Sequence, residues 1–217
     1  LNTPVTSMQA LLDEGYDAVF VGSGAPRGKD LRCAGRDEAG ATGRVHVGID
    51  WLGSVAFGHT ESIGKRVLII GAGNTAMDCC RTSLRLGARD VKVVARKPRD
   101  QLKASPWELE DALEEDVDLV TCHSPKAFVV EDGALKGMTF EVLEYFEEDG
   151  RQKSRVLDEV FMPADDVVLA IGQENAFPWI ERDIGIEFDE HDVPVVSRTT
   201  YQSTLPGVFF GGDAAFG

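Results

Sequence analysis

Short runs of apolar, mostly β-branched residues recur along the chain and mark the positions of buried strands. The clearest run, Val67–Ile70, suits a strand that is covered on both faces of a parallel sheet. Apolar residues from Ala76 to Leu86 then recur at helical spacing, and Gly87 is suited to ending a helix. This stretch predicts a strand, a glycine-rich turn and a helix in direct succession.

The same pattern continues after this helix. A second apolar run covers 90–96, and a third covers 118–122. Between them, Ser105 and Pro106 suit the N-cap and the first turn of a helix. The order strand, helix, strand, helix, strand is typical of one half of a doubly wound α/β fold.

Farther along, alternating apolar and polar residues predict an antiparallel meander. Three alternating segments are separated by Glu-Asp-Gly and Glu-Glu-Asp-Gly, which are typical of hairpin turns. A further buried strand is expected at Asp165–Ile171. The alternating segments are 127–131, 135–145 and 154–162.

The two ends of the chain carry weaker patterns. Before residue 65 we expect a helix, a strand that ends in a glycine turn, a surface loop, a second helix and a linker. These segments are 5–14, 16–24, 25–45, part of 46–58 and 59–64. Toward the other end we expect loop with a short helix, then an edge strand and a last strand, at 174–192, 193–198 and 207–213.

The turn between the first predicted strand and helix reads G-x-G-x-x-A, and its positions have separate physical roles. Gly71 allows the tight reversal, Gly73 leaves room for a pyrophosphate, and Ala76 lets helix and strand pack closely. A glycine turn that only joins strand to helix is the simpler alternative, but the second strand follows at the spacing of a dinucleotide site. The predicted cofactor-binding residues of the turn are Gly71, Ala72, Gly73, Asn74, Thr75 and Ala76.

Charged residues after the second strand indicate which dinucleotide is bound. Sites for NAD usually place a carboxylate there, which accepts hydrogen bonds from the ribose 2′-hydroxyl. This chain has Arg96 and Lys97 instead, a pair suited to a 2′-phosphate, and Arg99 or Lys103 follows nearby. The alternative is that these cations only offset the acidity of the protein. Their position relative to Gly71 favours the first interpretation, so NADPH is predicted over NADH.

Composition narrows the possible partners. The net charge of −15 and the lack of a basic stripe argue against nucleic acid and against anionic membrane surfaces. No apolar run approaches the roughly 20 residues that span a bilayer, so no membrane insertion is expected. The first residues do not resemble a signal peptide, and a cytoplasmic location is expected.

The four cysteines show no C-x-x-C pair and no metal-ligand spacing with a histidine, so no metal site is expected. A disulfide between the adjacent Cys79 and Cys80 would be strained on a helix. All four, including Cys33 and Cys122, are expected to be free thiols that pack as small apolar groups.

Six stretches of the sequence occur in an order that is specific to one kind of protein: 16–24, 48–52, 71–78 with Arg81, 93–97, 170–173 and 207–213. In this order they resemble the flavin-dependent reductase module of the glutamate synthase small subunit and of dihydropyrimidine dehydrogenase. That module belongs to the pyridine nucleotide-disulphide oxidoreductase superfamily, and the resemblance covers nearly the whole chain.

The resemblance implies an α/β fold in which a Rossmann-like NAD(P)H-binding domain is inserted into an incomplete FAD-binding domain. The implied ranges are 61–172 for NAD(P)H, and 1–60 with 173–217 for FAD. By the same resemblance, the turn residues bind the NADPH pyrophosphate, and its 2′-phosphate is bound by Arg96, Lys97 and Lys103. The residues near the nicotinamide are Ala170, Ile171, Gly172 and Gln173. The residues implied for FAD are Gly212 and Asp213.

The resemblance also implies an enzyme, an NAD(P)H-dependent flavin oxidoreductase in which electrons pass from NADPH through FAD to iron–sulfur centres. The implied partner is an iron–sulfur or large catalytic subunit of a redox complex. The family's FAD fingerprint and iron–sulfur segment do not occur in this sequence, so we expect part of a longer protein that does not turn over alone. The C-x4-C redox pair of the disulfide reductases does not occur either, and no residue is expected to be catalytic.

Two other functions make different demands on the sequence. A short-chain dehydrogenase needs a tyrosine four residues before a lysine, and none of Tyr16, Tyr145 and Tyr201 has a lysine at that position. A non-catalytic nucleotide-binding or scaffold subunit remains open, because the hydride acceptor would be the flavin rather than a side chain.

Overall fold

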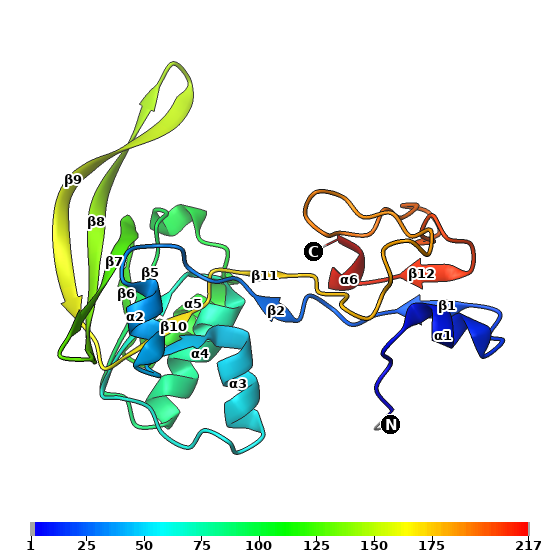
Figure 1. The fold of residues 1–217 in the computed structure, drawn as a ribbon. Helices are drawn as coiled ribbons and strands as arrows, with labels where there is room; N and C mark the ends of the chain where they lie inside the picture. The colour runs from blue at the N-terminus through cyan, green and yellow to red at the C-terminus, as the bar shows by residue number, and fades with distance from the viewer. Residues whose placement is uncertain (1–2, 217) are drawn as a thin grey trace. The chain divides into compact units, whose positions relative to one another are not determined.

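A computed structural model of the protein describes residues 3–216 and divides the chain into two compact units. Gly28–Gly172 forms one, and Leu1–Arg27 with Gln173–Gly217 forms the other. We call them the inserted unit and the flanking unit, because the first interrupts the second in sequence (Figure 1). The predicted insertion of one domain into another is therefore present in the chain.

A five-stranded parallel sheet in the order β3-β10-β4-β5-β6 forms the centre of the inserted unit. The predicted alternation of strands and helices is confirmed, since α4 follows β4 and α5 follows β5. The elements are β3 (Val45–Val47), β4 (Arg66–Ile70), α4 (Asn74–Arg85), β5 (Asp90–Val94), η1 (Arg99–Gln101), α5 (Pro106–Glu114), β6 (Asp118–Val120) and β10 (Asp166–Leu169).

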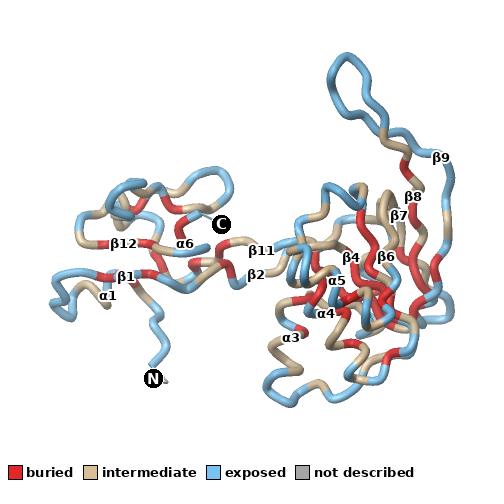
Figure 2. The backbone as a smooth tube through the Cα atoms, turned by 180° about the vertical axis from the view of Figure 1, so that it is seen from behind, coloured by how far each residue is buried: buried red, intermediate tan, exposed pale blue. Residues whose placement is uncertain are grey.

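Side chains of β4 point alternately to the two faces of the sheet, and each face has its own core. Figure 2 shows that β4 is buried along most of its length. Val67 and Ile69 pack against residues of α3 (Gly48–Ala56), α4 and α5. Leu68 and Ile70 pack against the meander and α2 (Arg36–Ala41). Because both faces are covered, the continuous apolar run of β4 is what this position requires.

The predicted meander is confirmed as a three-stranded antiparallel sheet in the order β7-β8-β9. Its strands are β7 (His123–Glu131), β8 (Ala134–Glu148) and β9 (Arg151–Pro163). Met138 and Phe140 of β8 are fully buried against the central sheet, whereas β9 is mostly exposed. Figure 1 shows that the turn between β8 and β9 projects away from the rest of the inserted unit.

The flanking unit contains a parallel pair, β1 (Val19–Val21) and β12 (Val208–Phe210), with α1 (Met8–Asp13) and α6 (Asp213–Phe216). Its core is separate from those of the inserted unit and includes Met8, Phe177 and Phe210. The short strands β2 (Arg27–Gly28) and β11 (Gln173–Glu174) pair where the chain passes from one unit to the other. Within residues 3–216, no helix is long and apolar enough to cross a membrane.

The region predicted as a loop at 25–45 differs from the structure, because it contains β2 and α2 and is followed by β3. Helix α2 has only six residues, too few to show a period in the sequence, and Asp37 and Glu38 stabilise its first turn. Strand β3 joins the central sheet by pairing with β10. The structural units therefore change at residues 27/28, whereas the sequence placed the first junction near residue 60.

Two predictions for the C-terminal part were wrong. Residues 174–192 contain no helix, and 193–198 form only the isolated bridges Phe188↔Pro194 and Val196↔Ser203. The segment changes partner within a few residues, because Val195 pairs with Glu187 whereas Ser197 pairs with Gln202, so no continuous ladder forms.

Candidate functional site

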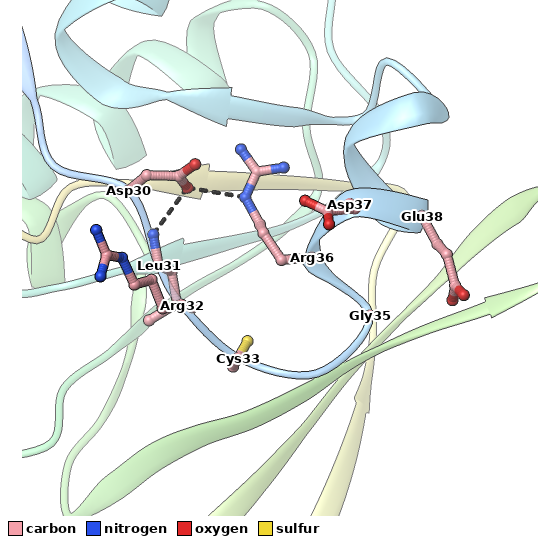
Figure 3. Close-up of a pocket in the computed structure, with 8 residues that line it drawn as sticks. All are labelled: Asp30, Leu31, Arg32, Cys33, Gly35, Arg36, Asp37 and Glu38. Carbon is pink, nitrogen blue, oxygen red and sulfur yellow. Dashed lines mark hydrogen bonds and ion pairs between the residues drawn. The ribbon is translucent and has the colours of Figure 1, made fainter.

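Several hollows open on the inserted unit. One, of about 380 Å³, is lined by residues of the β8–β9 hairpin alone, Tyr145 among them. The hollow of about 600 Å³ is lined by the loop that begins at Asp30 and by the first turn of α2 (Figure 3). The Asp30 carboxylate there already accepts hydrogen bonds from Arg36 Nε at 2.8 Å and from the Leu31 N–H at 2.7 Å. Since its charges are of both signs and partly pair with one another, this hollow gives no clear ligand chemistry.

A further hollow, of about 340 Å³, lies where β4, β5 and β10 end, the edge at which doubly wound sheets bind ligands. We call it the nucleotide cavity. Its lining residues are Gly71, Ala72, Gly73, Thr75, Ala95, Arg96, Lys97, Gln101, Leu102, Lys103, Ala170, Ile171 and Gly172.

The two glycines of the turn after β4 have different surroundings. Gly71 has φ +116°, and a Cβ on it would lie 2.2 Å from the Ala170 carbonyl oxygen. Its N–H donates to the Val94 carbonyl at 3.0 Å, so the turn is held between β5 and β10. Gly73 has φ −103°, and a Cβ there would meet nothing within 4 Å. The space beside Gly73 is therefore open, as a bound pyrophosphate requires.

Helix α4 begins directly at this open space. Its N-cap residue, Gly73, has no side chain with which to cap the helix start. The positive end of the helix dipole therefore faces the cavity, which Thr75 of the first turn also lines. Ala76 behind it is fully buried, as close packing of helix and strand requires.

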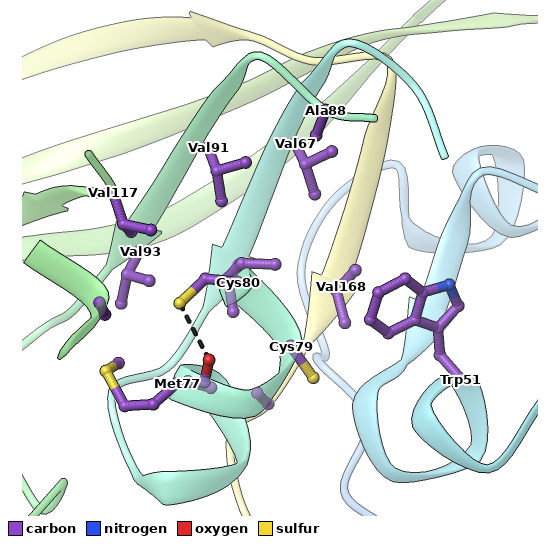
Figure 4. Packing of buried hydrophobic residues seen from close by; sticks show 14 residues of the cluster. Trp51, Val67, Met77, Cys79, Cys80, Ala88, Val91, Val93, Val117 and Val168 are labelled. Atoms are coloured by element: carbon purple, nitrogen blue, oxygen red, sulfur yellow. Dashed lines mark hydrogen bonds between the residues drawn. The ribbon is translucent and has the colours of Figure 1, made fainter. Parts of the chain in front are cut away.

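Cys79 and Cys80, also on α4, are fully buried in the core between helices and sheet (Figure 4). Burial raises the pKa of the Cys80 thiol to about 12, and it raises the pKa of Cys79 as well. The expected packing of these two cysteines as small apolar groups is confirmed. Neither thiol is available as a thiolate near neutral pH.

Three exposed cations border the nucleotide cavity: Arg96 and Lys97 after β5, and Lys103 before α5. Among the residues that the structure describes, none of the three forms an ion pair with a carboxylate. This is notable in a chain whose net charge is −15. The cavity therefore presents positive charge that the protein itself does not neutralise.

The loop that carries Lys103 is fixed to the glycine turn. The Ala72 carbonyl accepts the Ala104 N–H at 3.1 Å, and Asn74 Oδ1 accepts the Ser105 N–H at 2.9 Å. Ser105 is the N-cap residue of α5, as predicted, but its hydroxyl does not cap the helix; it accepts a hydrogen bond from Asn74 Nδ2 at 3.3 Å. The Asn74 side chain thus holds α5 and its preceding loop against the start of α4.

The remaining predicted residues fall in two places. Ala170, Ile171 and Gly172 line the nucleotide cavity, whereas Gln173 belongs to β11. Gly212 and Asp213 lie in the flanking unit, where they line a separate cavity of about 640 Å³.

Aromatic side chains, among them Phe20, Tyr201 and Phe216, line most of the cavity in the flanking unit, and no basic side chain is among its lining residues. This set fits the apolar edge of an aromatic ring system such as that of a flavin. The lining of this cavity offers no cation to a pyrophosphate.

Sequence reasoning missed several residues of the nucleotide cavity. Ala95, Gln101 and Leu102 line it, and Tyr145 of β8 donates a hydrogen bond to the Arg96 carbonyl at 2.9 Å. Nothing in the sequence pattern links position 145 to position 96. Within residues 3–216, no group of three or more His, Cys, Asp or Glu side chains is arranged to hold a metal ion.

Comparison with known proteins gives a consistent result. A family model described as pyridine nucleotide-disulphide oxidoreductase matches residues 7–217. The chain is 35% identical over 211 residues to the NADP(+)-dependent formate dehydrogenase subunit beta of Moorella thermoacetica, covering 95% of this chain and 29% of the relative. It is 35% identical over 227 residues to the glutamate synthase [NADPH] small chain of Halomonas elongata, covering 96% and 47%. The chain thus spans less than half the length of either relative.

A solved structure supports the fold. Mycobacterium tuberculosis FprA in complex with NADPH superposes with a TM-score of 0.77 at 19% sequence identity, over 99% of this chain and 62% of FprA.

Proposed function

The chain belongs to the pyridine nucleotide-disulphide oxidoreductase family, and we propose that it is the NADPH-binding part of a flavin-dependent oxidoreductase. The observation that carries this proposal is the set of Arg96, Lys97 and Lys103 at the nucleotide cavity, beside the open space at Gly73. Cations without a carboxylate partner, close to the N-terminal end of helix α4, suit a ligand with phosphates at two places. NADPH has that distribution of charge, because its 2′-phosphate lies apart from its pyrophosphate.

Each part of the cavity has a proposed role. The start of α4 and the backbone at Gly73 bind the pyrophosphate. Arg96, Lys97 and Lys103 bind the 2′-phosphate, where a guanidinium can donate two parallel hydrogen bonds. Residues 170–172 border the nicotinamide half. NADPH, when bound, supplies a hydride, and the residues of this chain bind and orient it.

We propose a flavin as the acceptor of the hydride. FAD and NADPH are the cofactors of the family, and we place Gly212 and Asp213 at the edge of the flavin in the longer protein. The proposed route continues to iron–sulfur centres or a large catalytic subunit. Support comes from the names of the two relatives, each of which describes one subunit or chain of an enzyme.

Calorimetric titration of the chain with NADPH and NADH tests the cofactor. We expect the double variant Arg96→Gln, Lys97→Gln to bind NADPH at least about 100-fold more weakly, because each of the two charge-assisted hydrogen bonds contributes about 1.5–3 kcal/mol. NADH, which lacks the 2′-phosphate, should change far less. Arg99→Gln is the matched control, since Arg99 is in the same loop but does not line the cavity.

Equal binding of NADPH and NADH by the unmodified chain, or no binding of either, would contradict the proposal. A flavin spectrum of the longer natural protein separates the enzyme from a non-catalytic scaffold. We expect a yellow protein with diaphorase activity, and a colourless protein without that activity would favour the scaffold.

A further inference from the structure

The hairpin of the meander reaches the cations of the nucleotide cavity through one side chain. We propose that Tyr145 of β8 is a positioning residue that holds Arg96 and Lys97 for the 2′-phosphate, and so determines the preference for NADPH over NADH. This inference rests on the proposed function, because it concerns the same cavity.

Tyr145 makes two contacts with this cation pair. Its hydroxyl donates to the Arg96 carbonyl oxygen at 2.9 Å, and the Lys97 ammonium lies over its ring, 5.3 Å from the centroid. The second contact is a cation–π interaction, in which the ring face attracts the positive charge. One side chain therefore fixes both the backbone of Arg96 and the charged end of Lys97.

The turn after β5 is held by three consecutive carbonyl groups. The Ala95 carbonyl accepts a hydrogen bond from the His123 N–H at 3.0 Å. The Arg96 carbonyl accepts one from the Tyr145 hydroxyl at 2.9 Å, and the Lys97 carbonyl accepts one from the Cys122 N–H at 3.4 Å. Two of the three donors are backbone groups. Tyr145 is the donor among them that a substitution can remove without changing the course of the chain.

The position of Tyr145 follows from the pleat of β8. It lies two residues after the buried Leu143 and projects from the same face of the strand. The Leu143 N–H donates to the Cys122 carbonyl at 2.7 Å, which fixes β8 beside the end of β6. Tyr145 is therefore positioned by a strand of the meander rather than by a loop.

This arrangement matters because the side chains of Arg96 and Lys97 form no ion pair within residues 3–216, although the backbone of the turn is held. Both side chains are exposed. A long free side chain loses rotamer freedom when it binds a ligand, and this loss weakens binding. If the Tyr145 ring already holds the Lys97 side chain beside the cavity, less rotamer freedom is lost when the ligand binds. This gain in binding free energy applies only to NADPH, because only NADPH has a 2′-phosphate that contacts the cation.

Two substitutions separate the contacts. Tyr145→Phe keeps the ring and removes the hydroxyl, and we expect NADPH to bind about 2- to 3-fold more weakly. Tyr145→Leu removes both contacts, and we expect NADPH to bind about 5- to 20-fold more weakly. The affinity for NADH should change less than about 2-fold in both variants. The ratio of the two dissociation constants is the readout, because a general loss of structure would weaken both nucleotides.

Phe146→Leu is the matched control. Phe146 is the next residue of β8, points to the opposite face and contacts the Arg155 guanidinium, which lies 5.8 Å from its ring centroid. We expect this variant to keep the NADPH-to-NADH ratio of the unmodified chain. Circular dichroism of all three variants checks that they fold, and Tyr145→Phe remains informative if Tyr145→Leu does not.

The outcomes distinguish this inference from the proposed function. If the unmodified chain does not prefer NADPH, the proposed function fails and this inference fails with it. If the unmodified chain prefers NADPH and a folded Tyr145→Leu variant keeps that preference, only this inference is overturned. Equal weakening of NADPH and NADH by Tyr145→Leu also overturns it.

Discussion

Gly71 and Gly73 are the same residue type for two different physical reasons. At Gly71 the backbone is in the left-handed region and a side chain would overlap the Ala170 carbonyl. At Gly73 the backbone angles suit any residue, and the space for a side chain is open. The first glycine is needed for folding of the turn, and the second, in our proposal, for the ligand.

This difference predicts opposite effects of alanine. Gly71→Ala should lower the free energy of unfolding by about 2–4 kcal/mol, from backbone strain and overlap. Gly73→Ala should leave it unchanged or raise it by up to about 1 kcal/mol, because alanine restricts the unfolded chain. Gly73→Ala should nevertheless weaken NADPH binding at least about tenfold, since the methyl group occupies the pyrophosphate space. Urea denaturation and calorimetric titration measure the two effects, and full NADPH affinity in Gly73→Ala would contradict the assigned role.

The candidate site could be anticipated in part from the residues. The glycine turn and the cations at 96, 97 and 103 follow from local patterns, because a strand, a turn and a helix are contiguous in sequence. Tyr145 could not be anticipated, since its contact with Arg96 spans 49 residues and depends on the register of the meander. The hydrogen bond from the Ser105 N–H to the Asn74 side chain could not be predicted either, because it depends on where α5 begins.

At the level of elements, long and regular patterns were predictive. The parallel strands β4, β5 and β6 and the meander were predicted, since each has a clear apolar run or alternation. Strand β3 was not predicted, because three residues are too few to show an alternating pattern. Only its pairing with β10 defines it as a strand. The predicted edge strand at 193–198 was wrong because the segment pairs first with Phe188 and then with Ser203, and an alternating pattern of side chains does not reveal such a change of partner.

The pairing of β10 with β4 is reinforced at its start by Asp165. Its carboxylate accepts hydrogen bonds from the Arg66 guanidinium, the Arg66 N–H at 2.9 Å and the Lys65 N–H at 3.0 Å. The hydrogen bond from the Arg66 side chain is the main reason that the pKa of Asp165 lies below its usual value of 3.8, with smaller effects of the backbone donors. The ionised form of Asp165 therefore stabilises the fold.

This lowered pKa predicts a dependence of stability on pH. A depressed folded-state pKa stabilises the protein above the ordinary value of 3.8, and the effect is lost as the pH falls through the folded-state value. Asp165→Asn should lower the free energy of unfolding by about 1 kcal/mol at pH 7, and the difference should shrink from about pH 4.5 downward. Urea denaturation over a pH series measures this, with Glu61→Gln, an exposed carboxylate, as control. A difference that stays constant from pH 7 to pH 3 would contradict the role of Asp165.

At the level of the whole chain, the two units differ in whether their residues are continuous in sequence. The inserted unit is continuous in sequence, whereas the flanking unit is made of two separate segments. The order of motifs indicated an insertion, but the exact junction depends on which sheet β3 joins, and this is a property of the folded chain. The cores follow the same division, since two clusters lie wholly in the inserted unit and one in the flanking unit.

This division leads to a prediction about residues 28–172 as an isolated segment. Both cores of the inserted unit and every lining residue of the nucleotide cavity lie within it, so it retains its buried apolar surface and its ligand groups. We expect the segment to fold cooperatively and to bind NADPH within about 3-fold of the full chain, since a free-energy difference under about 0.7 kcal/mol corresponds to that ratio. Circular dichroism, urea denaturation and NADPH titration of both chains make the comparison. The flanking segments 3–27 and 173–216, joined by a short linker, serve as the control and should bind no NADPH. Loss of NADPH binding by a folded 28–172 segment would show that residues outside it, among them Gln173, contribute to the nucleotide site.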